Sequence, residues 1–171
     1  MVGISLLGWS AVAWGQTCST SSQPDWRTRA RQTCEAIGVP GTLAQAVLQH
    51  ESNGHLYALR INAGHGYSLY PSTWDEAVRI LQALAPLTTN LDLGLMQINL
   101  RFWGSRLGMT AIQLLEPEMN VTVGCHILRR ALDRGGPAWQ RIGRYHSSNP
   151  ARQRRYAFQV ARQMEALFST K

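Results

Sequence analysis

Helical periodicity extends over most of this 171-residue sequence and is interrupted most clearly between Gly54 and Pro71. Within that interval, residues 56–62 and 67–70 alternate apolar and polar side chains on either side of the turn 63–66. This pattern predicts a hairpin of two short strands. Several helices with one small β element are typical of an α+β domain in which helices predominate. We therefore expect a single, predominantly α-helical α+β domain with a small β-hairpin element.

Proline, threonine and glycine mark the ends of the predicted helices. Pro24 and Gly38 delimit the first helix, and Thr42 and Gly54 are the expected N-cap and C-cap of the second. Further helices are expected over residues 74–85, capped by Ser72 or Thr73, from Thr110 to before Pro117, over residues 120–133, from Pro137 and from Pro150. In the last of these helices, Tyr156 is expected on the core side. Residues 91–99 are too short and too restricted by their glycine for a helix, so we expect an extended or bent segment there.

The sequence is 44% hydrophobic and 16% charged, and its formal net charge is +7. This composition is typical of a soluble globular protein. The positive charge favours an anionic partner, such as a nucleic acid, an acidic lipid or an anionic cell-wall polymer. The arginines are spread over several segments, and no run of basic residues alternates with aromatic residues. We therefore do not expect a nucleic acid as the main ligand.

The N-terminal segment predicts export. Residues 1–15 are uncharged and apolar, and they end in the small-x-small sequence Ala-Trp-Gly. This pattern predicts a signal peptide cleaved after residue 15, too short for stable membrane insertion. Residues 16–23 are rich in serine, threonine and glutamine and predict a flexible leader, which leaves residues 24–171 as the folded domain. A buried N-terminal helix is the alternative for residues 1–15.

The three cysteines, Cys18, Cys34 and Cys125, allow one disulfide and one remaining thiol in an exported protein. Cys34 and Cys125 are each expected on the core side of a helix, which favours this pair, but the sequence leaves the other pairs open. The sequence has no C-x-x-C, so we do not expect a zinc site of that type. His50 and His55 are five residues apart, whereas the zinc-protease helix needs histidines four apart.

Glu51 stands in the expected last turn of the second helix. The partial negative charge at a helix C-terminus opposes ionisation of a carboxyl group, and apolar neighbours would add a desolvation effect of the same sign. Because a general acid must hold its proton near neutral pH, Glu51 is a candidate for that role. A solvated surface glutamate is the alternative that position alone allows.

Three segments of the sequence together carry a family resemblance. They are Glu51-Ser52, Gly94-Leu95-Met96-Gln97-Ile98-Asn99 and Tyr145-His146-Ser147. In this order they resemble the soluble lytic transglycosylase catalytic domain of the lysozyme superfamily, over roughly residues 34–167. The hairpin and helix between the first two segments resemble, more specifically, transglycosylases that accompany type IV secretion, conjugation or pilus systems. Many members have asparagine where this chain has His146.

The resemblance implies a lysozyme-like fold and cleavage of the β-1,4 bond between MurNAc and GlcNAc, with a 1,6-anhydro-MurNAc product. A single glutamate, Glu51 here, would act as acid and then as base, with no metal or cofactor. The other residues carried over would bind the substrate or position Glu51: Ser52, Gly94, Met96, Gln97, Asn99, Tyr145 and His146. Gly94 would let a sugar approach the backbone, and Met96 and Gln97 would line the cleft. Tyr145 would hydrogen-bond Glu51.

The resemblance also implies peptidoglycan glycan strands as the substrate, a periplasmic location, and an envelope-spanning secretion or pilus machinery as a partner. Two alternatives stay open. Asp92 is the only acidic residue beside one of the motif residues, and with Glu51 it would make a hydrolytic muramidase. The other alternative is a non-catalytic peptidoglycan-binding scaffold on the same fold. The candidates for stacking on sugar rings are Tyr57, Tyr67, Trp74 and Trp103.

Overall fold

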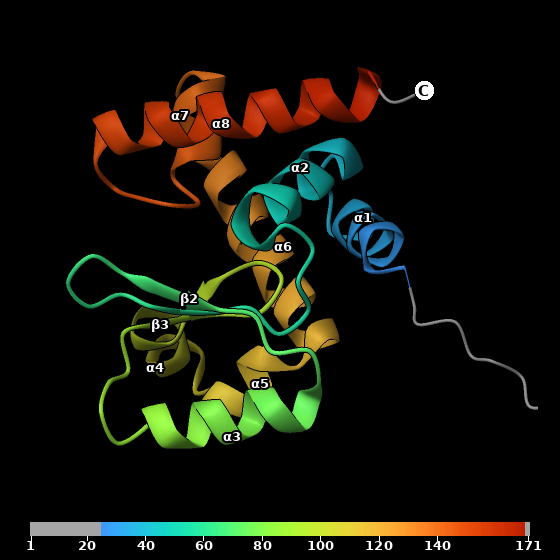
Figure 1. The fold of residues 1–171 in the computed structure, drawn as a ribbon. Helices are drawn as coiled ribbons and strands as arrows, with labels where there is room; N and C mark the ends of the chain where they lie inside the picture. The colour runs from blue at the N-terminus through green and yellow to red at the C-terminus, as the bar shows by residue number, and fades with distance from the viewer. Residues whose placement is uncertain (1–24, 170–171) are drawn as a thin grey trace, which may run out of the picture.

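The structure, a computed structural model, describes residues 25–169 (Figure 1). The predicted signal peptide, the predicted leader and Cys18 lie outside the described residues. The helices are α1 (Trp26–Ala36), α2 (Gly41–Ser52), α3 (Trp74–Leu84), α4 (Ser105–Leu107), α5 (Ala111–Leu115), α6 (Pro117–Asp133), α7 (Ala138–Gly143), α8 (Pro150–Ser169) and the π-helix η1 (Leu100–Gly104). The strands are β1 (Leu59–Ile61), β2 (Tyr67–Leu69), β3 (Leu91–Leu93) and β4 (Ile98–Asn99). The predicted α+β class with predominant helices is confirmed.

The strands form one antiparallel sheet in the order β2-β1-β3-β4. The predicted hairpin is the pair β1 and β2, in which Leu59 lies opposite Leu69. Residues 91–99, expected only as an extended or bent segment, supply β3 and β4. The turn between these two strands requires positive φ angles, which Gly94 (71°) and Gln97 (48°) adopt. The segment therefore folds back on itself and widens the sheet beyond the predicted hairpin.

The caps of α2 differ from the prediction by two residues at the N-terminal end, where Pro40 is the N-cap, and by one residue at the C-terminal end. The helix begins at Gly41, so Thr42 lies inside its first turn and is not the N-cap. At the other end, Asn53 adopts the left-handed conformation (φ 53°), a position predicted for Gly54. Asparagine tolerates this conformation better than most residues because its side chain is short and polar. Glu51 still falls in the last turn of α2, as predicted.

Helix α6 begins at Pro117, three residues before its predicted start at Asn120. The carboxylate of Glu116 accepts hydrogen bonds from two N–H groups of the first turn, and proline suits the first helical position. Thr110 caps α5 as predicted, and of the two predicted candidates Thr73 caps α3; each accepts a hydrogen bond from an N–H of the first turn.

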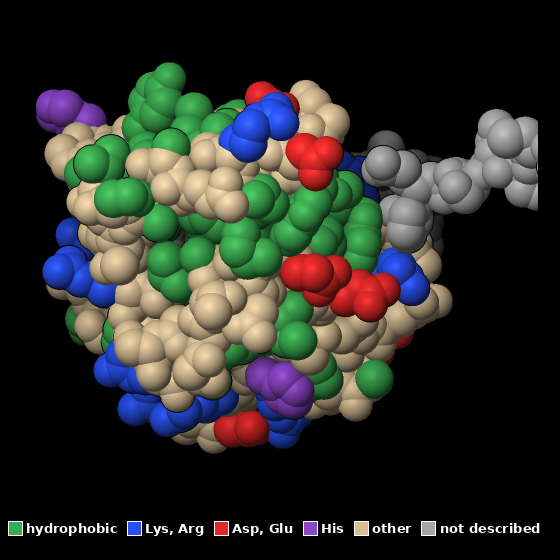
Figure 2. Space-filling model, turned by 90° about the horizontal axis from the view of Figure 1, so that it is seen from below, with side chains coloured by type: hydrophobic (Ala, Val, Ile, Leu, Met, Phe, Trp, Pro, Cys, Tyr) green, Lys and Arg blue, Asp and Glu red, His purple; other side chains and the backbone are tan. Residues whose placement is uncertain are grey.

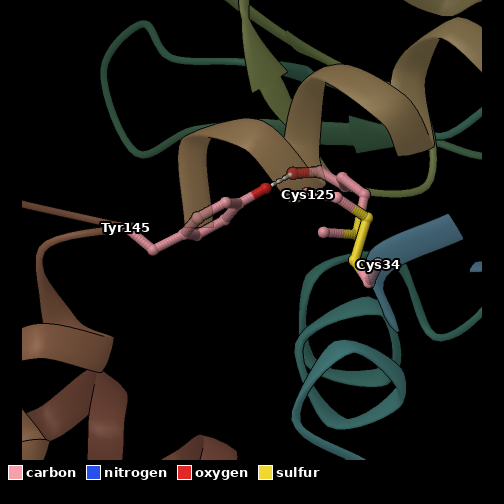
Figure 3. The surroundings of a disulfide bond; sticks show 4 residues. Cys34, Cys125 and Tyr145 are labelled. Carbon is pink, nitrogen blue, oxygen red and sulfur yellow. Dashed lines mark hydrogen bonds between the residues drawn. A yellow bond between two sulfur atoms is a disulfide. The ribbon is translucent and has the colours of Figure 1, made fainter. Parts of the chain in front are cut away.

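A disulfide ties the N-terminal helix to the centre of the core. Cys34 in α1 and Cys125 in α6 form it, and this is the pair that the sequence analysis favours (Figure 3). Around it, α2 packs against α1 and α8, and Leu48 of α2 and Leu128 of α6 are fully buried. The covalent link restricts the unfolded chain across 91 residues and so stabilises the fold. None of the helices within residues 25–169 is both long and apolar enough to cross a membrane.

Charged side chains are unevenly placed on the face that carries α3 and α5 (Figure 2). Apolar side chains gather across its middle, with acidic side chains toward one edge and basic side chains along the other. Leu87, which follows α3, is 79% exposed, and Ile112 of α5 is also exposed.

Candidate active site

A cleft of about 1070 Å³ lies between the β-sheet and the helices α6, α7 and α8. In Figure 1 the sheet lies below α7 and α8, and α2 ends above the sheet. Five of the eight residues that the resemblance carries over line this cleft: Glu51, Gln97, Asn99, Tyr145 and His146. The fold therefore brings together side chains from all three sequence segments.

Glu51 is half-buried at the end of α2. Burial raises the pKa of its carboxyl group to about 8. The hydroxyl of Tyr156 donates a hydrogen bond of 2.6 Å to Glu51 Oε1 and opposes part of this rise, whereas the charge of Asp92 adds to it. With a pKa of about 8, most of the Glu51 carboxyl is protonated at neutral pH, so it can donate a proton.

Tyr156 is the functional residue that the sequence analysis missed. It was expected only as a core residue of the last helix, and it is indeed 2% exposed. Its ring is stacked on the ring of His146, with centroids 4.9 Å apart and planes 3° apart, and His50 meets it edge-on at 5.1 Å. Burial and the neighbouring charge of Glu51 raise the Tyr156 pKa well above its usual value. The Tyr156 hydroxyl therefore stays protonated and remains the donor of the hydrogen bond to Glu51.

The hydroxyl of Tyr145 does not donate to Glu51, which corrects the prediction from the sequence. Its hydroxyl donates a hydrogen bond of 2.7 Å to the backbone carbonyl of Met96 (Figure 3). Its ring stacks beside that of Tyr156, with ring centroids 6.2 Å apart. The hydrogen bond to Glu51 that was predicted for Tyr145 is donated by Tyr156. His146, at the position where asparagine is frequent, contributes its ring to the same stack, and partial burial lowers its pKa.

The turn between β3 and β4 is held from inside the protein. Met96 is fully buried, so the prediction that its side chain lines the cleft is wrong. The N–H of Met96 donates to Asn120 Oδ1 at 2.7 Å, and Asn120 Nδ2 donates to the carbonyls of Leu93 and Leu114. A Cβ added at Gly94 would lie 2.6 Å from Asn120 Nδ2. The missing side chain of Gly94 therefore leaves room for the buried amide of Asn120, whereas the sequence analysis expected it to leave room for a sugar.

Gln97 and Ser52 differ in their access to the cleft. Gln97 lines it, and the side-chain amide donates to two backbone carbonyls, including that of Gly94. Ser52 is 3% exposed, and its hydroxyl donates to the carbonyl of Leu48 and accepts from a backbone N–H beyond the helix. Ser52 therefore stabilises the end of α2 and supports Glu51 through the helix, and the predicted contact with a sugar is not supported.

Asp92 on β3 is the second carboxylate that lines the cleft. Asn99 Nδ2 donates to one of its oxygens and Asn62 Nδ2 to the other, both at 2.7 Å. Asn99 thus lines the cleft, as expected, and also orients Asp92. Because the charge of Asp92 raises the pKa of Glu51, the two carboxyl groups interact electrostatically.

Only one of the four aromatic side chains proposed for sugar stacking lines the cleft. That residue is Trp103. Its neighbour Phe102, which was not proposed from the sequence, also lines the cleft, and the centroids of the two rings are 5.0 Å apart. Tyr57 and Trp74 pack edge-on against each other at 5.9 Å, and both are partly buried against the core. Tyr67 is 64% exposed on the edge strand β2. Trp103 therefore remains a candidate for stacking on a sugar ring, and Phe102 lies beside it.

The histidines around Glu51 have aromatic partners. His50 packs on Tyr156, and His55 contacts Tyr70 at 4.6 Å. In the part of the chain that the structure describes, no three His, Cys, Asp or Glu side chains are grouped so that they could hold a metal ion. The arrangement gives no support to a zinc site built from His50 and His55.

Residues 30–165 match the family model of the transglycosylase SLT domain. The chain belongs to this family. Lytic transglycosylases of this family act on peptidoglycan outside the cytoplasm, and the lysozyme-like arrangement of helices and a small sheet agrees with the match. The searches of curated proteins and of solved structures gave no match.

Proposed function

We propose that this chain is an active lytic transglycosylase that cleaves the β-1,4 bond between MurNAc and GlcNAc and leaves a 1,6-anhydro-MurNAc end. The observation that carries the proposal is the state of Glu51, a half-buried carboxyl at the cleft with a pKa of about 8. A single group with this pKa can serve as an acid and then as a base near neutral pH. The family match over residues 30–165 supports the choice of substrate.

In the first step, Glu51 donates its proton to the glycosidic oxygen while the bond between that oxygen and C1 of MurNAc breaks. Tyr156 occupies Glu51 Oε1, which leaves Oε2 to carry the proton. The acetamide oxygen of the same sugar stabilises the positive charge that develops at C1. GlcNAc leaves with the proton.

In the second step, the Glu51 carboxylate removes the proton from the C6 hydroxyl of MurNAc. The C6 oxygen then forms a bond with C1 and displaces the acetamide oxygen. The proton returns to Glu51, so the residue is ready for another cycle and no water is consumed. The hydrogen bond from Tyr156 stabilises the carboxylate between the two steps and keeps its pKa from rising further.

The test of the acid is Glu51→Gln. The variant should no longer clear a peptidoglycan suspension, while its circular dichroism stays that of the wild type. Clearing by the variant would show that Glu51 is not the acid. If neither protein clears the suspension but both bind it, the non-catalytic scaffold would replace the proposed enzyme.

The environment of Asp92 favours a hydrolytic muramidase as the second candidate function. Two amide donors hold this carboxylate in the cleft, where it could stabilise a cationic sugar or activate water. Asp92→Asn distinguishes the two mechanisms, because hydrolysis needs a second carboxylate. Under the proposed mechanism, the variant retains activity and its products keep anhydro ends. Loss of activity together with wild-type products that contain an added water would favour hydrolysis.

We further propose that the protein is exported to the periplasm after cleavage following residue 15. There it would open the wall locally for a secretion, conjugation or pilus apparatus. The apolar segment 1–15 supports the export, and the resemblance of the segment between Glu51 and Gly94 supports the apparatus. The intact mass of the exported protein tests the cleavage. Loss of DNA transfer or pilus assembly, restored by the wild type and not by Glu51→Gln, tests the role.

A further inference from the structure

The cleft carries many more positive than negative side chains. Its two carboxyl groups are those of Glu51 and Asp92. Its arginines come from the sheet and from the helices on the other side: Arg60, Arg106, Arg130, Arg134, Arg144 and Arg152. Low-dielectric walls concentrate the field of such charges, so the cleft attracts anionic groups.

None of these arginines is paired with a carboxylate among the described residues. The ion pairs within residues 25–169 are Arg29–Glu118, Arg31–Glu35 and Arg129–Asp133, and no member of them lines the cleft. The adjacent residues Arg129 and Arg130 show the contrast, since Arg129 pairs with Asp133 and Arg130 turns to the cleft without such a partner. The positive charge of the cleft is therefore left uncompensated by the protein.

Three of the cleft arginines are engaged by the protein in other ways. Arg144 donates to the backbone carbonyls that follow α6, at 2.7 and 2.8 Å. Arg106 donates to a backbone carbonyl and lies over the Phe102 ring at 3.7 Å, and Arg60 donates to the side chains of Asn62 and Ser68. These three side chains are therefore held in place by the protein and form part of the cleft wall.

The other three arginines form what we call the arginine wall: Arg130, Arg134 and Arg152. Arg130 lies in the last turn of α6, Arg134 is the extended residue that follows the helix, and both line the cleft. Arg152 stands in the first turn of α8, which runs above the end of α6 (Figure 1). No hydrogen bond from their guanidinium groups is formed within the described residues. Free guanidinium groups bind carboxylates through two parallel hydrogen bonds.

We propose that the arginine wall binds the carboxylates of the peptides attached to the glycan strand. The inference rests on the proposed function, because it takes peptidoglycan as the ligand. GlcNAc carries no charge, and MurNAc freed of its peptide carries the single carboxylate of its lactyl group, whereas the peptide on each MurNAc presents several free carboxylates. A cleft with uncompensated arginines therefore selects strands that still carry peptides over strands from which an amidase has removed them.

Binding to the Glu51→Gln protein tests this selection without cleavage. The probes are purified strands with intact peptides and the same strands after amidase treatment, each titrated at low and at high salt. We expect about tenfold tighter binding of the peptide-bearing strands at low salt, and a smaller ratio at high salt because salt screens exposed charges. Arg130→Gln, Arg134→Gln and Arg152→Gln together should abolish the difference. The matched control changes Arg79, Arg155 and Arg162, which lie on exposed helix faces outside the cleft.

Several results would overturn the inference. Equal affinity for the two kinds of strand, no binding of the peptide-bearing strands, or an equal loss in the control variant would each do so. Displacement by an oligonucleotide as readily as by free peptide would show a general polyanion site in its place. The wild-type protein gives the separate readout for the proposed function: if it binds peptide-bearing strands selectively but leaves them uncut, the enzyme assignment fails and the binding inference stands.

Discussion

Replacement of Glu51 by glutamine should stabilise the folded protein, and the gain should grow with pH. Folding keeps the Glu51 carboxyl protonated up to about pH 8, whereas the unfolded chain releases this proton near the usual pKa of 4.5. The stability linked to this group is therefore full below about pH 4.5 and is lost as the pH rises through about 8. Glutamine does not ionise and can still accept the hydrogen bond from Tyr156, so the variant avoids the loss.

The size of the effect follows from the two pKa values. At 1.36 kcal/mol for each pKa unit, the wild type loses about 1 kcal/mol at pH 5 and about 3 kcal/mol at pH 7 relative to acidic solution. The free energy of unfolding of Glu51→Gln should therefore exceed that of the wild type by about 2 kcal/mol more at pH 7 than at pH 5. An active enzyme would thus retain a carboxyl group that weakens its own fold.

Urea unfolding at pH 5, 6 and 7, followed by circular dichroism with the disulfide intact, measures this difference. The control is Glu165→Gln on the exposed side of α8, outside the cleft, for which the difference from the wild type should not grow with pH. If the stability curves of Glu51→Gln and the wild type run parallel between pH 5 and 7, the Glu51 carboxyl is not held protonated by the fold.

Other substitutions test the contacts around Glu51. Tyr156→Phe removes the hydrogen bond that lowers the Glu51 pKa. The fall of kcat/KM at high pH should therefore move to a higher pH, and the maximal rate should decrease. An unchanged pH profile would show that Tyr156 does not position Glu51. Gly94→Ala should destabilise the protein by about 2 kcal/mol or more, because φ is positive and the added methyl group meets Asn120. Gly64→Ala, which has a positive φ but open space, is the control, and an equal loss of thermal stability in both variants would exclude a role for packing.

Local signals in the sequence were sufficient for the hairpin, for the placement of Glu51 in a last helical turn and for the helices other than η1 and α4, which were not predicted. They were insufficient for β3 and β4, because the positive φ of a non-glycine residue, Gln97, completes the turn between them. Helix ends also shifted by one to three residues; for α6 the reason is that the side chain of Glu116 accepts hydrogen bonds from N–H groups of the first turn. Competition between possible caps depends on the surrounding packing and is not visible in the local sequence.

The site residues were predicted as a set, but several act through different atoms. Met96 contributes its carbonyl and N–H, while its side chain is buried, because a motif shows which residue is present and not which of its atoms is used. Tyr156 was assigned to the core by its helical spacing, correctly, but the spacing gives no sign that its hydroxyl reaches Glu51, 105 residues away. Asn120 likewise looked like an ordinary helix residue, although it holds the turn beside the cleft.

The mass of the muropeptides released from peptidoglycan by the wild-type protein tests the central claim most directly. In the proposed mechanism the C6 hydroxyl of the sugar is the nucleophile, so every new MurNAc end should be the 1,6-anhydro form. Ends heavier by one water molecule would contradict the mechanism, since they would show that water attacks C1. In that case Asp92, held by its two asparagines in the same cleft, would be the residue to examine for its activation.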